Sequence, residues 1–219
     1  MLHNTLYIDL KSYWHAGSGR SAGALADALV QKTAQGLPVI GGRHIKGLLR
    51  HALSKAQTMG WYSSIHLPEG PAQTLETLLF GSGSQQEGRF ATLPGMLLVS
   101  DASLPEAEAQ WLAAHENAHV RQYLYSRISS TAINQEGAAV ENSLRTLEVS
   151  MPMKLEAGLQ LAVLAVNEDH RIQQQAWLEQ AKPWLPLIEA SSMIESVGAS
   201  RSRGLGEAQF TWGVPQGAK

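Results

Sequence analysis

The chain has 219 residues, of which 44% are hydrophobic and 16% charged, and its formal net charge is −2. These values are typical of one globular domain with a buried core. They argue against a free-standing nonspecific nucleic-acid binder, which is usually basic, and the absence of cysteine excludes disulfides, thiolate metal sites and a cysteine nucleophile.

Hydrophobic periodicity predicts an alternation of strands and helices. The first half is expected to hold a strand at 4–11, a glycine-rich loop at 16–24, a turn or short strand at 28–32, a strand at 37–40, and helices at 43–58 and 72–79. The second half is expected to hold a strand at 95–101, a helix at 104–117, an exposed hairpin or loop at 134–143, strands at 144–152 and 157–166, a helix at 168–190 interrupted near Pro183 and Pro186, and a strand at 208–213.

This element order predicts an α+β fold with a ferredoxin-like antiparallel sheet in a single domain over residues 1–219. No stretch approaches the length of a membrane span, and the first residues alternate like a strand rather than a signal peptide, so we expect a cytoplasmic protein. His115 and His119 lie four apart on an expected helix, but with no third ligand evident we interpret them as surface residues rather than a metal pair.

A glycine-rich run, GASRSRGLG at 198–206, is the most informative feature of the chain. Gly204 and Gly206 can take backbone angles closed to other residues. Arg201 and Arg203 are two residues apart, so an extended backbone would point both side chains the same way. Because a guanidinium group suits phosphate, the run predicts a clamp on a phosphodiester backbone, although a solvated turn with two exposed arginines fits it equally well.

A second candidate site lies in GLPVIGGRHIKGLLR at 36–50, where basic residues crowd the start of an expected helix. Cations there oppose the helix dipole, whereas the free amides at that end suit an anion. A bound phosphate would neutralise Arg43, His44, Lys46 and Arg50, so the cluster predicts anion binding. The alternative is that Lys46 and Arg50, four apart, form the solvent-exposed face of an amphipathic helix.

Four blocks of sequence, in order, carry a resemblance to a known family. They are TAQGLPVIGGRHIKGLLRHAL, then LLFG with GMLLVSDASL, then TAINQEGAAVENSLRTLEVSMPMKLEAGLQLAVLAV, and finally GASRSRGLGEAQF, spanning roughly residues 27–210. Together they resemble the RAMP superfamily of CRISPR-associated proteins, specifically the repeated backbone subunit of type III effector complexes of the Csm and Cmr kinds.

The resemblance implies an RRM-type, ferredoxin-like sheet in a subunit that stacks head to tail along a guide RNA (crRNA). It implies a β-hairpin thumb at about 127–153 that inserts into the guide–target duplex, with Ile133 and Met151 as candidate apolar wedges unless they pack in the core. The implied partners are guide RNA, complementary target RNA, copies of the chain itself and other effector subunits. The residues expected to bind RNA are Arg20, Arg43, His44, Lys46, Arg50, Arg145, Arg201, Arg203 and Gly204, and Arg145 has the alternative of pairing with Glu141 or Glu148.

Target-RNA cleavage in this family uses an aspartate shortly before the GLP block, and Asp27 holds that position here. Asp27 would ligate Mg²⁺ against the scissile phosphate and help to activate the ribose 2′-hydroxyl. The alternative is a cap or a solvated loop residue, because no second carboxylate lies within ten residues of Asp27.

The sequence also departs from the family pattern. GGRH at 41–44 replaces PGSS, and AINQ at 132–135 replaces AIDR, which loses an acid and a base. These changes leave open a non-catalytic RNA-binding subunit of a divergent type III or type IV complex. Two further alternatives are a guide-processing endoribonuclease that uses His15 or His44 as general acid or base, and a domain that binds a phosphate-bearing small molecule at Gly41–Arg43.

Overall fold

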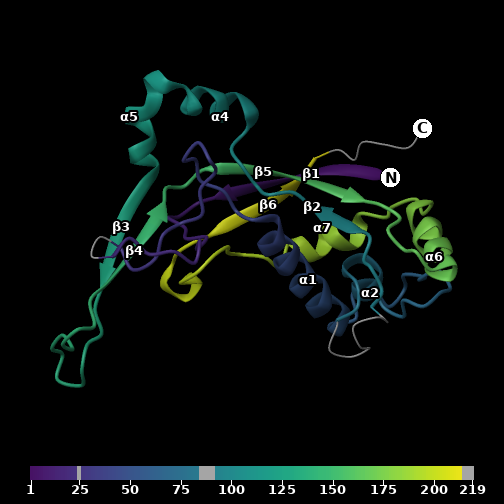
Figure 1. Ribbon diagram of the computed structural model, residues 1–219. Coiled ribbons are helices and arrows are strands. Elements are labelled where there is room, and N and C mark those ends of the chain that lie inside the picture. The colour runs from purple at the N-terminus through teal and green to yellow at the C-terminus, as the bar shows by residue number, and fades with distance from the viewer. Residues whose placement is uncertain (24–25, 84–91, 214–219) are drawn as a thin grey trace.

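The computed structural model describes residues 1–23, 26–83 and 92–213, and these form a mixed α/β structure (Figure 1). Its main sheet is antiparallel and has the strand order β2–β5–β1–β6. The strands are β1 (Leu2–Leu10), β2 (Leu97–Val99), β5 (Lys154–Leu161) and β6 (Ala208–Trp212). A second sheet is an antiparallel hairpin of β3 (Tyr125–Ser130) and β4 (Arg145–Ser150).

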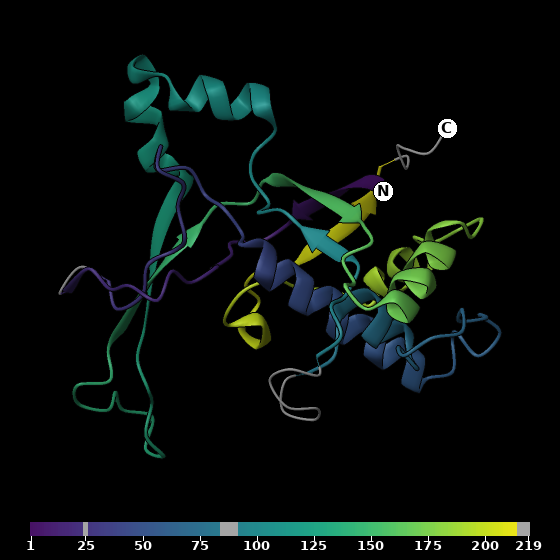
Figure 2. The same cartoon turned by 45° about the vertical axis from the view of Figure 1, so that its right-hand side comes forward.

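The helices are divided between the main sheet and the hairpin. In Figures 1 and 2, α1, α2, α6 and α7 lie on one side of the main sheet, whereas α4 and α5 lie beyond the base of the hairpin. Their bounds are α1 Gly42–Thr58, α2 Leu75–Phe80, α4 Glu106–Ala113, α5 Ala118–Arg121, α6 Glu168–Leu178 and α7 Leu185–Ser191, with 3₁₀ turns at His115–Asn117, Gln122–Leu124 and Arg201–Arg203.

The core lies between the main sheet and these helices. Along β1, Leu6, Ile8 and Leu10 are buried, whereas Tyr7 and Asp9 on the other face are not, as the two-residue period of a strand requires. Helix α1 buries a stripe at helical spacing that includes Ile45, Leu49 and Leu53. Each such side chain contributes about 1.5–3 kcal/mol through its transfer from water, so strand and helix hold each other in place.

The β3–β4 hairpin projects away from the main sheet (Figures 1 and 2). Residues 131–142 at its tip are exposed throughout. The exposed hairpin or loop expected at 134–143 is therefore the connection between β3 and β4, and it buries almost nothing that would stabilise the domain.

Several expected elements have different bounds. Residues 28–32 and 37–40 make isolated bridges rather than strands: Ala28 pairs with Leu147 of β4, and Ile40 pairs with Ala102. Strand β5 begins at Lys154 rather than 157, and the expected helix 104–117 ends at Ala113. The expected helix 168–190 is divided into α6 and α7; Pro183 lies in the break, whereas Pro186 lies in the first turn of α7, where a proline is tolerated.

Two expectations touch the limits of the described ranges. The last residue of the expected loop 16–24 lies outside them. Among the helices that the structure describes, none combines the length and the apolar character needed to cross a bilayer.

Candidate nucleic-acid interface

The glycine-rich run forms a tight exposed turn rather than an extended clamp. Arg201–Arg203 is one 3₁₀ turn between Ser200, with φ 57°, and Gly204, with φ 80°, both left-handed. Residues two apart in such a turn are roughly two-thirds of a turn apart, so Arg201 and Arg203 do not point the same way, contrary to the extended geometry expected. Both arginines and Gly204 are nevertheless exposed, so the turn presents its charges to solvent.

Both ends of this turn are held against the segment that follows β1. The Ala199 amide donates to the His15 carbonyl at 2.9 Å, and the Gly206 amide donates to the Tyr13 carbonyl at 2.7 Å. A Cβ at Gly198, whose φ is 88°, would lie 2.9 Å from the carbonyl carbon of His15, so only glycine fits there. The fold thus fixes the position of the turn.

His44 joins helix α1 to this turn. The Gly198 amide donates to His44 Nε2 at 3.3 Å, a contact that requires the unprotonated nitrogen. Burial, and secondly the charge of Arg201, lower the pKa of His44. Arg43, beside it in the first turn of α1, is exposed. The two basic segments predicted separately from the sequence therefore meet in space.

Lys46 and Arg50, by contrast, have partners within the protein. Lys46 Nζ donates to the Leu97 carbonyl at 2.6 Å, and burial, followed by the charge of Arg50, lowers the pKa of Lys46. Arg50 Nε donates to Glu76 Oε1 at 2.7 Å, and its Nη2 donates to the Gly81 carbonyl at 3.3 Å. A bound phosphate would have to compete with these contacts, so the exposed Arg43 is the best placed of the four basic residues to meet one.

The N-terminal end of α1 has a partner that the sequence analysis missed. The Gly42 amide donates to Asp101 Oδ1 at 2.7 Å, so a carboxylate already occupies part of the end assigned to a phosphate. A Cβ at Gly42 would lie 2.7 Å from the Ser100 carbonyl oxygen, so glycine permits this close approach. The signal available in the sequence was an aspartate two residues after the end of β2.

Asp27 lies beside the hairpin. Its amide donates to the Thr146 carbonyl at 2.8 Å, and the Thr146 amide donates to Asp27 Oδ2 at 2.6 Å. The expected RNA-binding residues Arg20 and Arg145 also belong to this region: the Arg20 carbonyl accepts from Leu29, and Arg145 precedes Thr146. Arg145 pairs with Ser130 at the end of the two strands that lies toward the tip of the hairpin.

A network at the base of the hairpin explains why Glu148 is not the partner of Arg145. Glu148 Oε1 accepts from Lys32 Nζ at 2.9 Å, and its Oε2 accepts from the Val30 amide at 3.1 Å. Lys32 Nζ also lies 3.8 Å from the centre of the Tyr125 ring, and Tyr125 donates to the Gly36 carbonyl at 2.6 Å. These contacts, which the sequence analysis missed, tie the strand pair to the segment that follows Asp27.

The two candidate wedge residues occupy different places. Ile133 is 68% exposed at the tip, whereas Met151 is 39% exposed at the base, where its backbone bonds to Leu124 and Trp14. Leu144, also 68% exposed, is a further apolar tip residue that sequence reasoning did not select. Its position directly after the polar residues 141–143 was the signal in the sequence that could have pointed to it.

Metal and acid–base candidates are sparse. Across residues 1–23, 26–83 and 92–213, no group of three or more His, Cys, Asp or Glu residues is arranged to hold a metal ion. Asp27 offers a single carboxylate. It could hold Mg²⁺ only if phosphate oxygens of the substrate and water molecules supplied the remaining ligands. His15 is only 3% exposed, and its Nδ1 lies 2.6 Å from the Glu148 carbonyl, which disfavours acid–base work on RNA.

Comparison with known proteins identifies the family. The sequence model of the RAMP superfamily matches this chain over residues 7–209. The chain belongs to the RAMP superfamily.

Solved structures agree on the fold of this RAMP protein. A chain of "Type III-B Cmr-beta bound to cognate target RNA" aligns with a TM-score of 0.59 at 10% identity, covering 96% of each chain. A chain of the apo state of Type III-B Cmr-beta aligns with a TM-score of 0.60, again at 10% identity and covering 96% of each chain. A search among curated proteins gave no match.

Proposed function

We propose that this RAMP protein is a guide-RNA-binding backbone subunit of a type III CRISPR effector complex. The observation that carries the proposal is the joined basic surface, in which the exposed turn with Arg201 and Arg203 meets the start of α1 through the Gly198–His44 hydrogen bond. Guanidinium groups at a fixed turn suit phosphate contacts, which position RNA without reading its sequence. The similar fold of a Cmr-beta chain in a complex bound to target RNA supports this role.

We also propose a ferredoxin-type core with a functional thumb. The succession β1–α1–β2–β5, then α6 with α7, then β6, in the order β2–β5–β1–β6, is compatible with the βαββαβ plan of ferredoxin-like folds. The β3–β4 hairpin is then an insertion between β2 and β5. Its exposed Ile133 and Leu144 suit insertion into a guide–target duplex held by successive copies of the chain.

Cleavage of target RNA at Asp27 is the further step of the proposal. When bound, Mg²⁺ would neutralise charge on the scissile phosphate and favour ionisation of the attacking 2′-hydroxyl. Asp27 would hold this ion through its carboxylate, which the Thr146 amide orients through Oδ2. Among the described residues, no group of three or more His, Asp or Glu side chains is arranged to hold a metal ion at Asp27 or elsewhere. This favours, as the second candidate, a structural subunit of a type III or type IV complex that binds without cutting.

The test of RNA binding is the double variant Arg201→Ala with Arg203→Ala. We expect weaker binding of single-stranded RNA and a salt dependence, d log K/d log [salt], that is shallower by about 1.4, since each lost phosphate contact removes about 0.7. The matched control is Arg171→Ala with Lys182→Ala, which removes two exposed charges on and just beyond α6. Equal affinity and slope in both double variants would refute the role of the turn.

The test of cleavage is Asp27→Asn in the effector complex purified through a tag on this chain. The asparagine oxygen can still accept from Thr146, so the loop stays anchored while the carboxylate charge is lost. We expect Mg²⁺-dependent cuts in a guide-complementary RNA to fall at least about a hundredfold, with guide binding retained. Asp169→Asn, in the first turn of α6, is the control. A wild-type complex that binds target RNA without cutting it would establish the structural subunit instead.

A further inference from the structure

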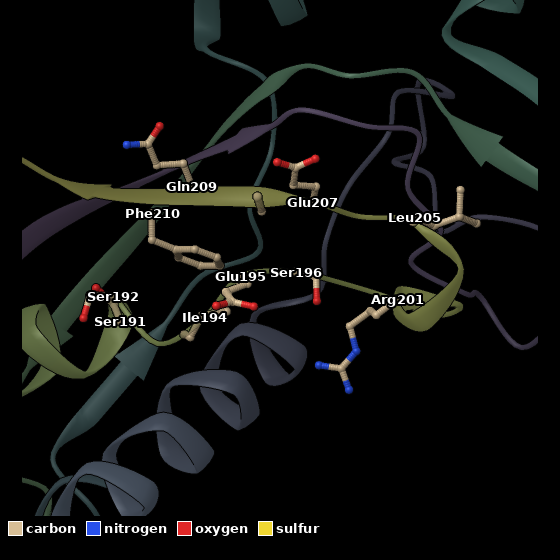
Figure 3. Close-up of a pocket in the computed structure, with 12 residues that line it drawn as sticks. Ser191, Ser192, Ile194, Glu195, Ser196, Arg201, Leu205, Glu207, Gln209 and Phe210 are labelled. Atoms are coloured by element: carbon tan, nitrogen blue, oxygen red, sulfur yellow. The ribbon is translucent and has the colours of Figure 1, made fainter.

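Two adjoining hollows lie beside the Arg201 turn, and of the residues that line them the proposed function uses only Arg201. The larger, of about 690 Å³, lies between the end of α7, residues 194–196 and the start of β6 (Figure 3). The smaller, of about 190 Å³, lies between residues 193–196 and α1. Both are lined by Ile194, Glu195, Ser196 and Arg201, so one bound molecule could occupy the two together.

The larger hollow has an aromatic wall and unused polar groups. Figure 3 shows Phe210, Glu195, Ser196 and Arg201 on the same side of β6, whereas Glu207 and Gln209 point to the other side. Within the described part of the chain, the side chains of Glu195 and Arg201 form no hydrogen bond or ion pair. An aromatic ring beside a carboxylate and a hydroxyl suits a planar heterocycle that stacks and donates N–H groups.

The smaller hollow is basic. His51 and Lys55 line it from α1, where their spacing of four places them on one face, and Arg201 lines it from the turn. Three basic side chains around a space of this size suit a phosphate group. A phosphate there would lie next to the larger hollow, so the phosphate and the base of one nucleotide could occupy the two hollows together.

We propose that the two hollows together bind one guanine nucleotide, with its base against Phe210 and its phosphate among His51, Lys55 and Arg201. The Glu195 carboxylate would accept from the N1–H and N2–H donors of guanine. Adenine presents an acceptor at N1, and uracil has carbonyl oxygens beside a single N–H, so both pair less well with a carboxylate. Where the nucleotide is a residue of bound RNA, the inference rests on the proposed function; a free guanine nucleotide offers the same chemistry.

The first arm of the test measures binding of GMP, AMP and UMP to the full chain by calorimetry. We expect GMP to bind about tenfold more tightly than UMP, the scale of a bidentate base contact. Glu195→Gln should remove this preference, and Phe210→Leu should weaken GMP binding at least about fivefold by removing the stacking surface. Glu108→Gln on α4, far from both hollows, is the control and should change nothing, and thermal unfolding confirms that each variant folds.

The second arm compares an oligouridine with the same RNA carrying one guanosine. A guanosine preference that disappears in Glu195→Gln supports the site for RNA. GMP binding that depends on Glu195, in a chain that binds neither RNA, supports a free-nucleotide site and refutes the proposed function instead. RNA binding with no base preference, together with no difference among the three nucleotides, overturns the inference and leaves the proposed function intact.

Discussion

Among single residues, His44 is the one whose charge state bears directly on the contact between α1 and the glycine-rich turn. The family pattern has a serine at this position, and the imidazole here accepts a hydrogen bond from the Gly198 amide instead. Burial and the neighbouring Arg201 both disfavour the charged ring, so the pKa of His44 is lowered in the folded chain. The contact is therefore linked to pH.

This linkage predicts a change in stability with pH. Because the folded pKa lies below the ordinary value of 6.5, protonation costs stability at low pH, and the cost disappears as the pH rises past 6.5. His44→Gln does not titrate, so its free energy of unfolding, followed by thermal melting, should rise relative to that of the wild type as the pH falls from about 7.5 to 5. The difference should be less than about 1 kcal/mol, because solvent still reaches part of the ring and screens its charge. Parallel melting curves across this range would disprove the linkage.

At the scale of elements, helix α1 determines where the basic surface lies. Its N-terminal turn approaches the backbone at the end of β2 so closely that only Gly42 fits, and the Gly42 amide donates to the Asp101 carboxylate. Five residues later Gly47 is exposed within the helix, and a Cβ there would meet nothing within 4 Å. A side chain is therefore excluded at position 42 and accommodated at position 47.

Two matched substitutions test this difference. Gly42→Ala should destabilise the domain by about 1–3 kcal/mol, since the methyl group would overlap the carbonyl oxygens of Val99 and Ser100. Gly47→Ala should stabilise it by about 0.5–1 kcal/mol, since alanine favours the helix. Urea denaturation measures both, and a neutral Gly42→Ala would show that α1 can move away from β2.

At the scale of the whole molecule, the hairpin is separate from the core that stabilises the domain. Its tip is exposed throughout, whereas its base is tied to the preceding loop by Glu148, Lys32 and Tyr125. A projecting element with a fixed base suits contact with a partner beyond the domain. Its tip should thus be removable without loss of the fold.

The corresponding prediction concerns a variant in which an Asn-Gly turn replaces residues 134–142. We expect the free energy of unfolding to change by no more than about 0.5 kcal/mol, because the removed residues are exposed. Target engagement by the assembled complex should change, as measured by target-RNA binding with guide loaded. Loss of the folded state would place this segment in the core instead.

Local patterns of the sequence determined much of this protein. Alternation in β1, the apolar stripe of α1 and the helix break near Pro183 each report on their own backbone and burial, and all three predictions were confirmed. The four family blocks likewise predicted membership of the RAMP superfamily, because motifs of this kind retain their order along the chain.

Only the tertiary structure decided which charged groups remain free. Lys46 bonds to Leu97, Gly42 bonds to Asp101 across 59 residues of sequence, and Thr146 bonds to Asp27 across 119. The compact turn at Arg201–Arg203 is likewise held from outside, by segments packed against both of its ends. The spacing of residues along a chain shows which side chains share one face of a helix or strand. The hydrogen-bond partner of a side chain depends instead on which distant segment the packing brings within hydrogen-bond distance.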